Sequence, residues 1–369
     1  MTPFTRAVAT LGALAGLALT AAGAGSTAVG AVPAEGAVSV VTSDPARNPV
    51  GALTSYARLM AIPSLDSGAV PDSRAPRESG SDPCPPDRCV DRRVPVPAGV
   101  KVSDNRVRIL LPTGYSAPRN AGRRYPVIML LNGARGQYDG WSVKSEIVEM
   151  SRRWPAILVM PAGGTGDLAG MFSDWHDGSY DWETFHTKVV VPWVDRTFRT
   201  LPGARGIAGA SMGGIGAFTY AAHHPGMFKA VLSISGDVDT TSLATGAVAP
   251  DLLGPLGVSF PGPDLRRVWG DPVRDRANWD FHNPTKLVDR LRGVEVLVTS
   301  GTGFSGGSGI YSGTFERNLW NTHRTFLAAL TEAGIPYRAR VSVGGVHDWR
   351  YFNRPLRWAA PRLIAAVLR

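Results

Sequence analysis

The sequence predicts an α/β protein whose central sheet is mostly parallel and is covered by helices on both faces. From residue 90 onward, short apolar segments typical of strands alternate with amphipathic segments typical of helices. Most of the apolar segments are nearly continuous, as expected of strands that are buried on both faces of a parallel sheet. The chain has 369 residues, 44% of them apolar, and is therefore long enough to bury a large core in one main domain.

A sheet of about eight strands is expected. In chain order the predicted strands are 92–98, 106–112, 125–132, 156–161, 205–210, 229–235, 294–300 and 337–343. Apolar and polar residues alternate in the first two, so we expect these to be antiparallel strands at the edge of the sheet. Most of the later strands are expected to form its buried interior.

Helical patterns lie between these strands and after the last one. They cover roughly 141–153, 181–198, 212–224, 284–292, 314–333 and 355–368. In the pattern at 314–333, apolar residues recur on one face, and Gly334 is placed to end the helix.

Residues 1–31 have the composition of a secretory signal peptide. Arg6 forms a short basic region, a small and apolar stretch follows, and residues 29–31 (VGA) provide a cleavage site. Residues 32–90 are rich in Pro, Ser, Gly and Ala, and are predicted to form a linker or a loosely packed extension before a folded domain at 91–369. No later segment has the length and apolarity of a membrane span. We therefore expect a secreted or cell-envelope protein with no transmembrane segment in the mature chain.

The chain has only two cysteines, Cys84 and Cys89, which are separated by four residues. In an exported protein such a pair favours a disulfide, since a metal site would need two further ligands nearby. The loop that this bond closes is short, so the disulfide is expected to fix local structure rather than to hold the whole fold together.

The formal net charge is +9, and arginine carries almost all of the positive charge. Nucleic-acid-binding proteins concentrate such charge in runs or stripes, whereas here the arginines are scattered in ones and twos. The charge therefore argues against nucleic acid as a partner and leaves attraction to an anionic cell envelope open.

Ser211 lies in the sequence GASMG (209–213), where small residues stand on both sides of it. A predicted strand ends directly before it and a predicted helix begins directly after it. This is the setting of a nucleophile elbow, in which small neighbours avoid collisions and the N–H of Met212 can donate to an oxyanion. A second match to the pattern, around Ser305 at 303–307, is not followed directly by a helical pattern. Close packing of a strand against a helix is the alternative explanation for the small residues.

In the α/β-hydrolase fold, the catalytic acid and then the histidine follow the nucleophile along the chain. Between the strand predicted at 294–300 and the last histidine there are only two carboxylates, Glu316 and Glu332. Glu332 lies at the far end of a predicted helix, whereas Glu316 lies at its near end, just after the loop that leaves the strand. Glu316 is therefore the expected acid.

His347 is the expected base because it follows the last predicted strand on a loop with two glycines. His323 lies in the middle of a predicted helix and is expected to be a core residue. The earlier histidines lie too close to the nucleophile in sequence or precede the acid. Ser211, His347 and Glu316 are thus predicted to act as nucleophile, base and orienting acid.

The loop at 130–141 is expected to supply a second donor to the oxyanion. Two glycines in this loop allow its backbone to approach the nucleophile closely, so the donor is the N–H of Ala134 or of Arg135. An acidic cluster at 174–181 lacks the ligand spacing of a metal site. No metal and no other cofactor is expected.

Four sequence blocks make the chain resemble the secreted esterase family that includes the mycolyltransferases. The blocks are LLNGARGQYDGW (130–141), FSDW with YDWETF (172–175 and 180–185), GASMGGIGA (209–217) and GVHDWRYF (345–352). Their order and spacing match the family from about residue 92 to the carboxyl end. The resemblance implies an α/β-hydrolase fold and the activity of a serine esterase or acyltransferase.

The resemblance also assigns roles to individual residues. The nucleophile, acid and histidine of the family fall on Ser211, Glu316 and His347, and its two oxyanion amides fall on Met212 and Ala134.

The acceptor-sugar site of the family falls on Arg135 and Trp349, with trehalose as the sugar in the mycolyltransferases. Where those enzymes carry an aspartate in the oxyanion loop, this chain has Asn132, which removes a negative charge beside the expected sugar site. These three residues are the expected substrate-binding residues. Hydrolysis of an ester and transfer of its acyl chain to a sugar hydroxyl both remain open. A catalytically idle envelope-binding or adhesion protein on a hydrolase scaffold is the alternative from a different class.

Overall fold

The computed structural model describes residues 38–44, 82–244, 262–303 and 310–369. The chain divides into two units, Met1–Val32 and Pro33–Arg369, and every described residue belongs to the second. The predicted signal peptide and most of the predicted linker at 32–90 lie outside the described residues.

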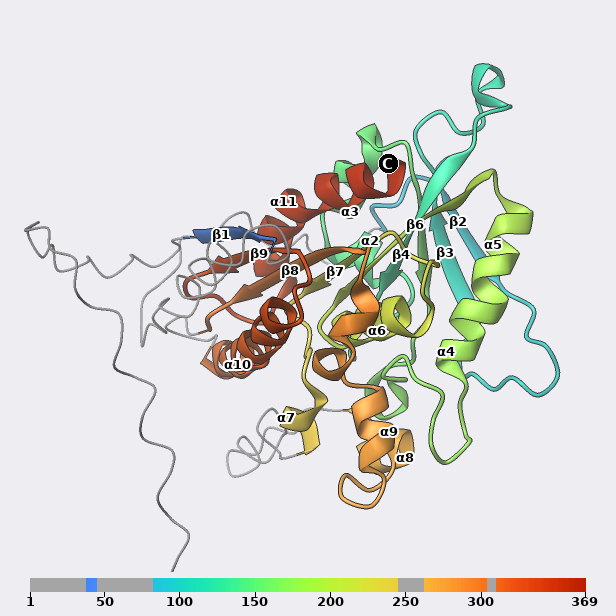
Figure 1. The fold of residues 1–369 in the computed structure, drawn as a ribbon. Helices are drawn as coiled ribbons and strands as arrows, with labels where there is room; N and C mark the ends of the chain where they lie inside the picture. Colours follow the sequence, from blue (N-terminus) through green and yellow to red (C-terminus); the bar gives the residue numbers. More distant parts are fainter. Residues whose placement is uncertain (1–37, 45–81, 245–261, 304–309) are drawn as a thin grey trace, which may run out of the picture. The chain divides into compact units, whose positions relative to one another are not determined.

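A nine-stranded sheet in the order β1-β9-β8-β7-β6-β4-β5-β3-β2 forms the centre of the second unit (Figure 1). The strands are β1 Val38–Ser43, β2 Cys89–Arg93, β3 Arg106–Leu110, β4 Tyr125–Leu131, β5 Ile157–Pro161, β6 Thr200–Ala210, β7 Ala230–Ile234, β8 Glu295–Gly301 and β9 Tyr337–Ser342. Neighbours are parallel from β9 to β5, whereas β5 with β3 and β3 with β2 are antiparallel. The mostly parallel sheet with two antiparallel strands at one edge is therefore confirmed.

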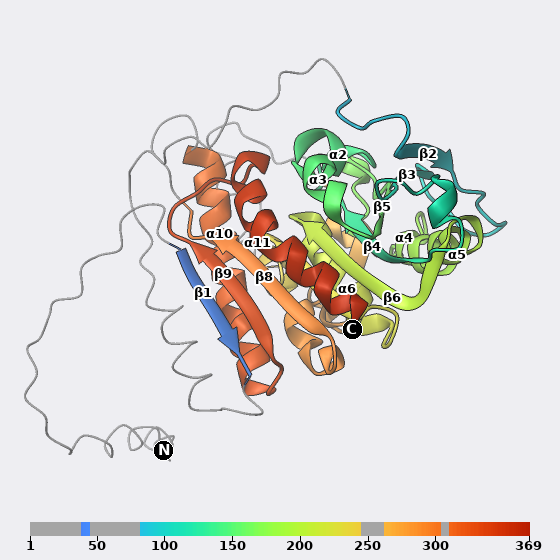
Figure 2. The same cartoon turned by 90° about the horizontal axis from the view of Figure 1, so that it is seen from above.

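The sequence does not predict β1, which raises the strand number from about eight to nine. This strand pairs antiparallel with β9 over its whole length, from Val38↔Ser342 to Ser43↔Tyr337 (Figure 2). Within it Val41 is buried, whereas Val40 is half exposed. Such a short edge strand buries few apolar side chains, so its pattern does not stand out from the surrounding polar segment.

Helices cover both faces of this sheet (Figure 1). The α-helices are α2 Gly140–Lys144, α3 Ile147–Met150, α4 Trp182–Thr184, α5 Val191–Thr197, α6 Met212–His223, α7 Thr240–Ala244, α8 Leu265–Trp269, α9 Arg276–Phe281, α10 Ile310–Glu332 and α11 Trp349–Leu368. On one face, Leu356 and Leu363 of α11 belong to an apolar cluster with residues of the central strands. On the other face, Phe218 of α6 packs edge to face against Phe326 of α10, with 4.7 Å between ring centroids. Among the described residues, no helix has both the length and the apolar character that crossing a bilayer requires.

The pattern at 141–153 predicts one helix, but the structure has α2, α3 and a short 3₁₀ turn there. Ser145 explains the break. Its Oγ donates to the carbonyl of Trp141 at 2.5 Å and accepts from the N–H of Ile147 at 3.1 Å. These side-chain bonds compete with the helical backbone bonds, and Ser145 adopts an extended conformation.

The segment predicted as a helix at 284–292 likewise forms two 3₁₀ turns, Pro284–Lys286 and Val288–Leu291. The other four predicted helices are present, at 182–197, 212–223, 310–332 and 349–368. The first of these contains a π-helical stretch, Phe185–Val190, just before Pro192. Pro192 has no N–H to donate to the preceding turn, which favours a local change of the hydrogen-bond pattern.

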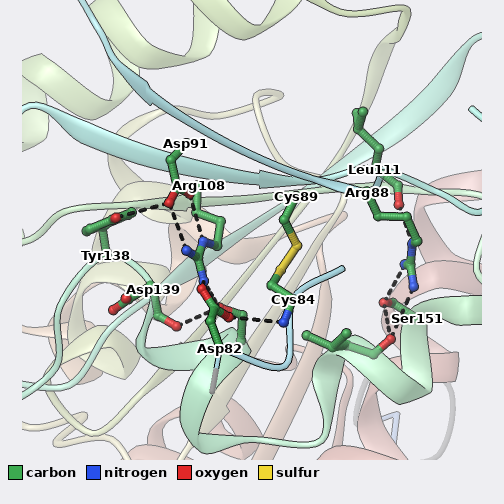
Figure 3. The surroundings of a disulfide bond; sticks show 12 residues. Asp82, Cys84, Arg88, Cys89, Asp91, Arg108, Leu111, Tyr138, Asp139 and Ser151 are labelled. Carbon is green, nitrogen blue, oxygen red and sulfur yellow. Dashed lines mark hydrogen bonds and ion pairs between the residues drawn. A yellow bond between two sulfur atoms is a disulfide. The ribbon is translucent and has the colours of Figure 1, made fainter. Parts of the chain in front are cut away.

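A disulfide joins Cys84 to Cys89 at the start of β2 (Figure 3). Between the two cysteines, the buried Arg88 side chain donates to the carbonyls of Leu111 and Val148 and to the Ser151 hydroxyl. The expected disulfide is thus present, and it holds a short loop from which an arginine anchors the edge of the sheet to the α3 region. Arg108 forms a second anchor, through ion pairs with Asp82 and Asp91.

We expect Arg88→Ala to lower the free energy of unfolding by about 2–4 kcal/mol, because it removes three buried hydrogen bonds and leaves the carbonyl of Leu111 without its side-chain donor. Urea denaturation followed by circular dichroism measures this change. Arg92→Ala is the matched control, since Arg92 lies nearby in β2 but is exposed, and its side chain bonds to the neighbouring carbonyl of Asp91. Equal stability of the two variants would contradict the anchoring role.

Candidate active site

Ser211 lies on the sharp turn between β6 and α6. Its backbone has φ 55° and ψ −125°, a conformation that costs a residue with a Cβ about 1–3 kcal/mol. Hydrogen bonds to both neighbouring elements hold the turn: the Ser211 N–H donates to the carbonyl of Ile234 in β7, and the Ser211 carbonyl accepts from the N–H of Gly214 in α6. The geometry is that of a nucleophile elbow, which presents the hydroxyl at the carboxyl end of the sheet.

The small residues around Ser211 allow this turn to form. A Cβ on Gly209 would lie 1.8 Å from the carbonyl oxygen of Gly213. A Cβ on Gly213 would lie 2.3 Å from the carbonyl oxygen of Leu131 in β4. The two explanations of the motif are therefore compatible, since close packing of strand against helix is what permits the strained serine.

His347 follows β9 on a loop and reaches back to Ser211. Its Nε2 lies 2.8 Å from the Ser211 Oγ, and its Nδ1 lies 2.8 Å from Oε2 of Glu316. The imidazole packs between the rings of Phe315 and Phe352, with centroid distances of 4.7 Å and 5.0 Å. The structure thus brings together the three residues that the sequence assigns to nucleophile, base and acid.

Glu316 is almost fully buried in the first part of α10. Its Oε1 accepts hydrogen bonds from the Ser235 hydroxyl at 2.6 Å and from the Gly301 N–H at 2.8 Å, which leaves Oε2 for His347. Burial raises the pKa of this carboxyl, but the hydrogen bond and charge of His347 and the bonds from Ser235 and Gly301 lower it by more. The net pKa lies below the ordinary value, so Glu316 stays ionised.

Ser235 and Gly301, two partners of the acid, are not predicted by the sequence. Ser235 follows β7, has φ 47° and is buried, so its hydroxyl is held toward the acid by an unusual backbone conformation. Gly301 ends β8, the neighbouring strand. The only signal in the sequence was their position at the ends of two predicted strands, where parallel strands place functional groups.

The loop after β4 passes directly over Ser211. A Cβ on Gly133 would lie 3.3 Å from the Cβ of Ser211, so the backbone at Gly133 and Ala134 approaches the nucleophile closely. Met212 is the first residue of α6, and its N–H therefore has no acceptor within the helix. Of the two residues expected to donate to an oxyanion, Met212 thus directly follows the serine, and Ala134 directly follows the glycine that approaches it.

The three expected substrate-binding residues differ in their surroundings. Asn132 is buried, and its Nδ2 donates to the carbonyls of Gly133 and Gly136, so it holds the loop from below. Arg135 is exposed on the same loop. Trp349 is half buried at the start of α11 and packs edge to face on Trp141, with 5.0 Å between centroids.

The amino-acid sequence matches a known protein family and several known relatives. The Esterase family model matches residues 102–363. An esterase of Mycobacterium tuberculosis, Rv1288, is 31% identical over 245 residues, which cover 65% of this chain and 52% of the relative. The chain thus spans about half the length of that relative. The diacylglycerol acyltransferase/mycolyltransferase Ag85B of Mycobacterium leprae is 27% identical over 261 residues, covering 66% of this chain and 77% of the relative.

Solved structures share the fold. Mycobacterium tuberculosis MPT51 (FbpC1) superimposes with a TM-score of 0.59 at 21% identity, over 75% of this chain and 97% of that structure. A ferulic acid esterase gives a TM-score of 0.57 at 22% identity, over 76% of this chain and 98% of the other. The fold is therefore that of the α/β-hydrolases, as the strand order and the elbow indicate. Since the family match covers most of the folded part, the chain belongs to the Esterase family.

Proposed function

We propose that this protein is an exported serine esterase or acyltransferase that acts through an acyl-serine intermediate. The observation that carries the proposal is the hydrogen-bonded chain from the Ser211 hydroxyl through His347 to the buried Glu316, with 2.8 Å at each step. Nucleophile, base and orienting acid within hydrogen-bond reach are what acyl transfer requires.

In the first half of the reaction, the Ser211 Oγ attacks the ester carbonyl while the Nε2 of His347 takes the hydroxyl proton. The carbonyl oxygen becomes an oxyanion that accepts hydrogen bonds from the N–H groups of Met212 and Ala134. His347 then gives its proton to the departing alkoxide, and the acyl group stays on Ser211. Glu316 holds the imidazole in the tautomer that accepts the proton and stabilises the imidazolium that forms.

In the second half, His347 takes a proton from water or from a sugar hydroxyl, and the resulting nucleophile attacks the acyl-serine. The bond between the acyl carbon and the Ser211 Oγ then breaks, and His347 returns the proton to this oxygen. Water gives a free acid, whereas a sugar gives a new ester. Arg135 and Trp349 are the residues proposed to contact the acceptor, with trehalose as the first candidate. Asn132 lies beneath the loop with its amide bonded to backbone carbonyls, so we assign it to shaping this site.

The cellular location belongs to the same proposal. Residues 1–31 are proposed to be a signal peptide, and residues 91–369 the hydrolase domain. The disulfide between Cys84 and Cys89 supports an oxidising compartment. The net charge of +9 supports association with an anionic cell envelope.

Product analysis tests the proposal and separates its two forms. The mature protein is incubated with a simple acyl ester, with and without trehalose, and the products are identified by mass spectrometry. We expect ester cleavage in both cases; acyl-trehalose identifies a transferase, and free acid alone identifies an esterase. If no ester is cleaved and a fluorophosphonate fails to label Ser211 in folded protein, the proposal is wrong, and a binding protein on a hydrolase scaffold is the better explanation.

A further inference from the structure

A cluster of ligating side chains lies at the end of α6 remote from Ser211. It contains Glu183 from α4, His223 from the last turn of α6 and His282, which directly follows α9. One ligand atom from each of these residues lies within 4.8 Å of the other two. The side chains of Glu183 and His223 are only 12% and 3% exposed, and His282 is 4% exposed. The proposed reaction uses none of these groups.

The contacts of His282 leave its Nε2 as an acceptor. The Ser173 Oγ lies 3.2 Å from the Met171 carbonyl, 2.9 Å from the Trp269 indole N–H and 3.3 Å from Nδ1 of His282. The carbonyl can only accept and the indole can only donate. All three contacts are therefore hydrogen bonds only if Nδ1 of His282 carries the proton. In the neutral ring, Nε2 then presents a lone pair.

His223 is constrained in the same way from its other side. Its Nε2 lies 2.8 Å from the carbonyl oxygen of Phe281, which can only accept, so this nitrogen carries a proton. Its Nδ1 lies 2.9 Å and 3.1 Å from the two carboxylate oxygens of Glu183. A neutral ring would direct a lone pair at a carboxylate, so a positive charge is needed at this contact, either between the two atoms or bound beside both of them. That charge is either a second proton on His223 or a metal ion.

We propose that Glu183, His223 and His282 bind one divalent transition-metal ion of the Zn²⁺ class. Two imidazole nitrogens and one carboxylate oxygen form a common Zn²⁺ ligand set, with bonds of about 2.0–2.2 Å. Ligand atoms around a tetrahedral ion then lie about 3.4 Å apart, and two bound imidazoles have centroids about 5 Å apart. The centroids of His223 and His282 are 5.5 Å apart, close to this value, whereas Nδ1 of His223 and the carboxylate oxygens of Glu183, now at 2.9 Å and 3.1 Å, would have to move apart by about 0.3–0.5 Å.

The surroundings of the cluster have the second layer of contacts that metal-binding histidines need. The Phe281 carbonyl and the Ser173 hydroxyl each accept from the nitrogen that points away from the ion, which fixes the tautomer and the ring orientation. His224 donates to Oε1 of Glu183 at 2.9 Å and orients the carboxylate. Three protein ligands leave the fourth position to water.

This ion would serve stability rather than ester chemistry. The cluster and Ser211 lie at opposite ends of the 12-residue helix α6, about 18 Å apart along its axis. The three ligands come from segments that are far apart in sequence, so one ion would join α4, α6 and the end of α9. An ion that binds only the folded chain raises its stability.

The test uses full-length mature protein without a histidine tag, dialysed against a chelator and then titrated with Zn²⁺. We expect one Zn²⁺ per chain and a midpoint of thermal unfolding that rises by about 3 °C or more. His282→Gln should weaken binding by about 100-fold or more. His176→Gln is the matched control, because His176 lies near Asp275 but is about half exposed, and it should bind Zn²⁺ as the original chain does.

Two further measurements keep the outcome decisive. Co²⁺ added to the unaltered protein should give the visible absorption of a tetrahedral site, which does not depend on any variant. Fluorophosphonate labelling and ester turnover of His282→Gln should remain within about twofold, which shows that the variant is folded. If Zn²⁺ does not bind stoichiometrically and the Co²⁺ bands are absent, His223 carries a second proton and the proposal is overturned. Unchanged affinity in His282→Gln would overturn it as well.

Discussion

Ser211→Ala is expected to reduce ester turnover by about 10⁴-fold or more while the fold remains intact. The hydroxyl is the only group of the triad that forms a bond to the substrate, so no acyl-enzyme can form without it. Alanine keeps the Cβ and therefore tolerates the same turn with φ 55° as well as serine does. Steady-state kinetics with a chromogenic ester gives the rate, and circular dichroism gives the fold.

The chain provides its own control for this variant. Ser305 lies in the second G-x-S-x-G match, at 303–307, and Ser305→Ala should keep both turnover and fluorophosphonate labelling. Turnover of Ser211→Ala close to that of the unaltered protein would show that a different residue is the nucleophile.

Glu316→Gln is expected to lower kcat by about 10³–10⁴-fold, although the side chain has nearly the same shape. The reason lies in the two donors that face its first oxygen. The Ser235 hydroxyl and the Gly301 N–H both require an acceptor, so they fix the glutamine with its carbonyl toward them. The amide NH₂ then faces Nδ1 of His347 and forces the imidazole proton onto Nε2. That nitrogen can no longer take the proton from Ser211.

Glu332→Gln is the matched control, since Glu332 lies on the same helix but is exposed at its far end. It should leave kcat within about twofold, because surface substitutions rarely disturb a distant site. Measuring kcat and KM separately distinguishes a wrong tautomer, which lowers kcat, from a loss of substrate binding, which raises KM. A fall in turnover of the same size in both variants would remove Glu316 from its assigned role.

Local patterns in the sequence predict which three residues come together in the hydrogen-bonded chain, because each lies at the end of a predicted element. Ser211 stands between a strand and a helix, Glu316 stands near the start of a helix, and His347 follows the last strand. In an α/β fold these ends meet at one edge of the sheet, so chain order alone leaves few candidates for the acid and the base.

The partners of the acid could not be found in this way. Ser235 and Gly301 donate to Glu316 only because β7, β8 and α10 pack together, and nothing in a nearby stretch of sequence encodes that contact. The residues Glu183, His223 and His282 are likewise brought together only by tertiary packing, since they have no regular spacing in the sequence. No metal is expected from the sequence, where only the two cysteines and the acidic residues at 174–181 are candidate ligands.

The single helix predicted at 141–153 and the missing strand β1 are errors with a different cause. Ser145 interrupts an otherwise helical pattern with two side-chain hydrogen bonds. Whether a serine forms such bonds depends on its local surroundings and not on the apolar periodicity of the segment. At β1, the burial of Val41 depends on β9, which lies about 300 residues further along the chain. A periodic pattern of apolar residues reveals a buried strand only when several residues of that strand are buried.

The pairing of β1 with β9 also sets an order of assembly. As the chain is synthesised, the first strand of the sheet has to wait for almost all of the remaining residues before its partner exists. The same late strand leads into the loop that carries His347. The strand that completes this edge of the sheet and the proposed catalytic base are therefore synthesised almost together. If the proposed mechanism holds, a nascent or truncated chain that ends after β8 contains Ser211 but lacks both Glu316 and His347, so we expect it to have no activity toward esters.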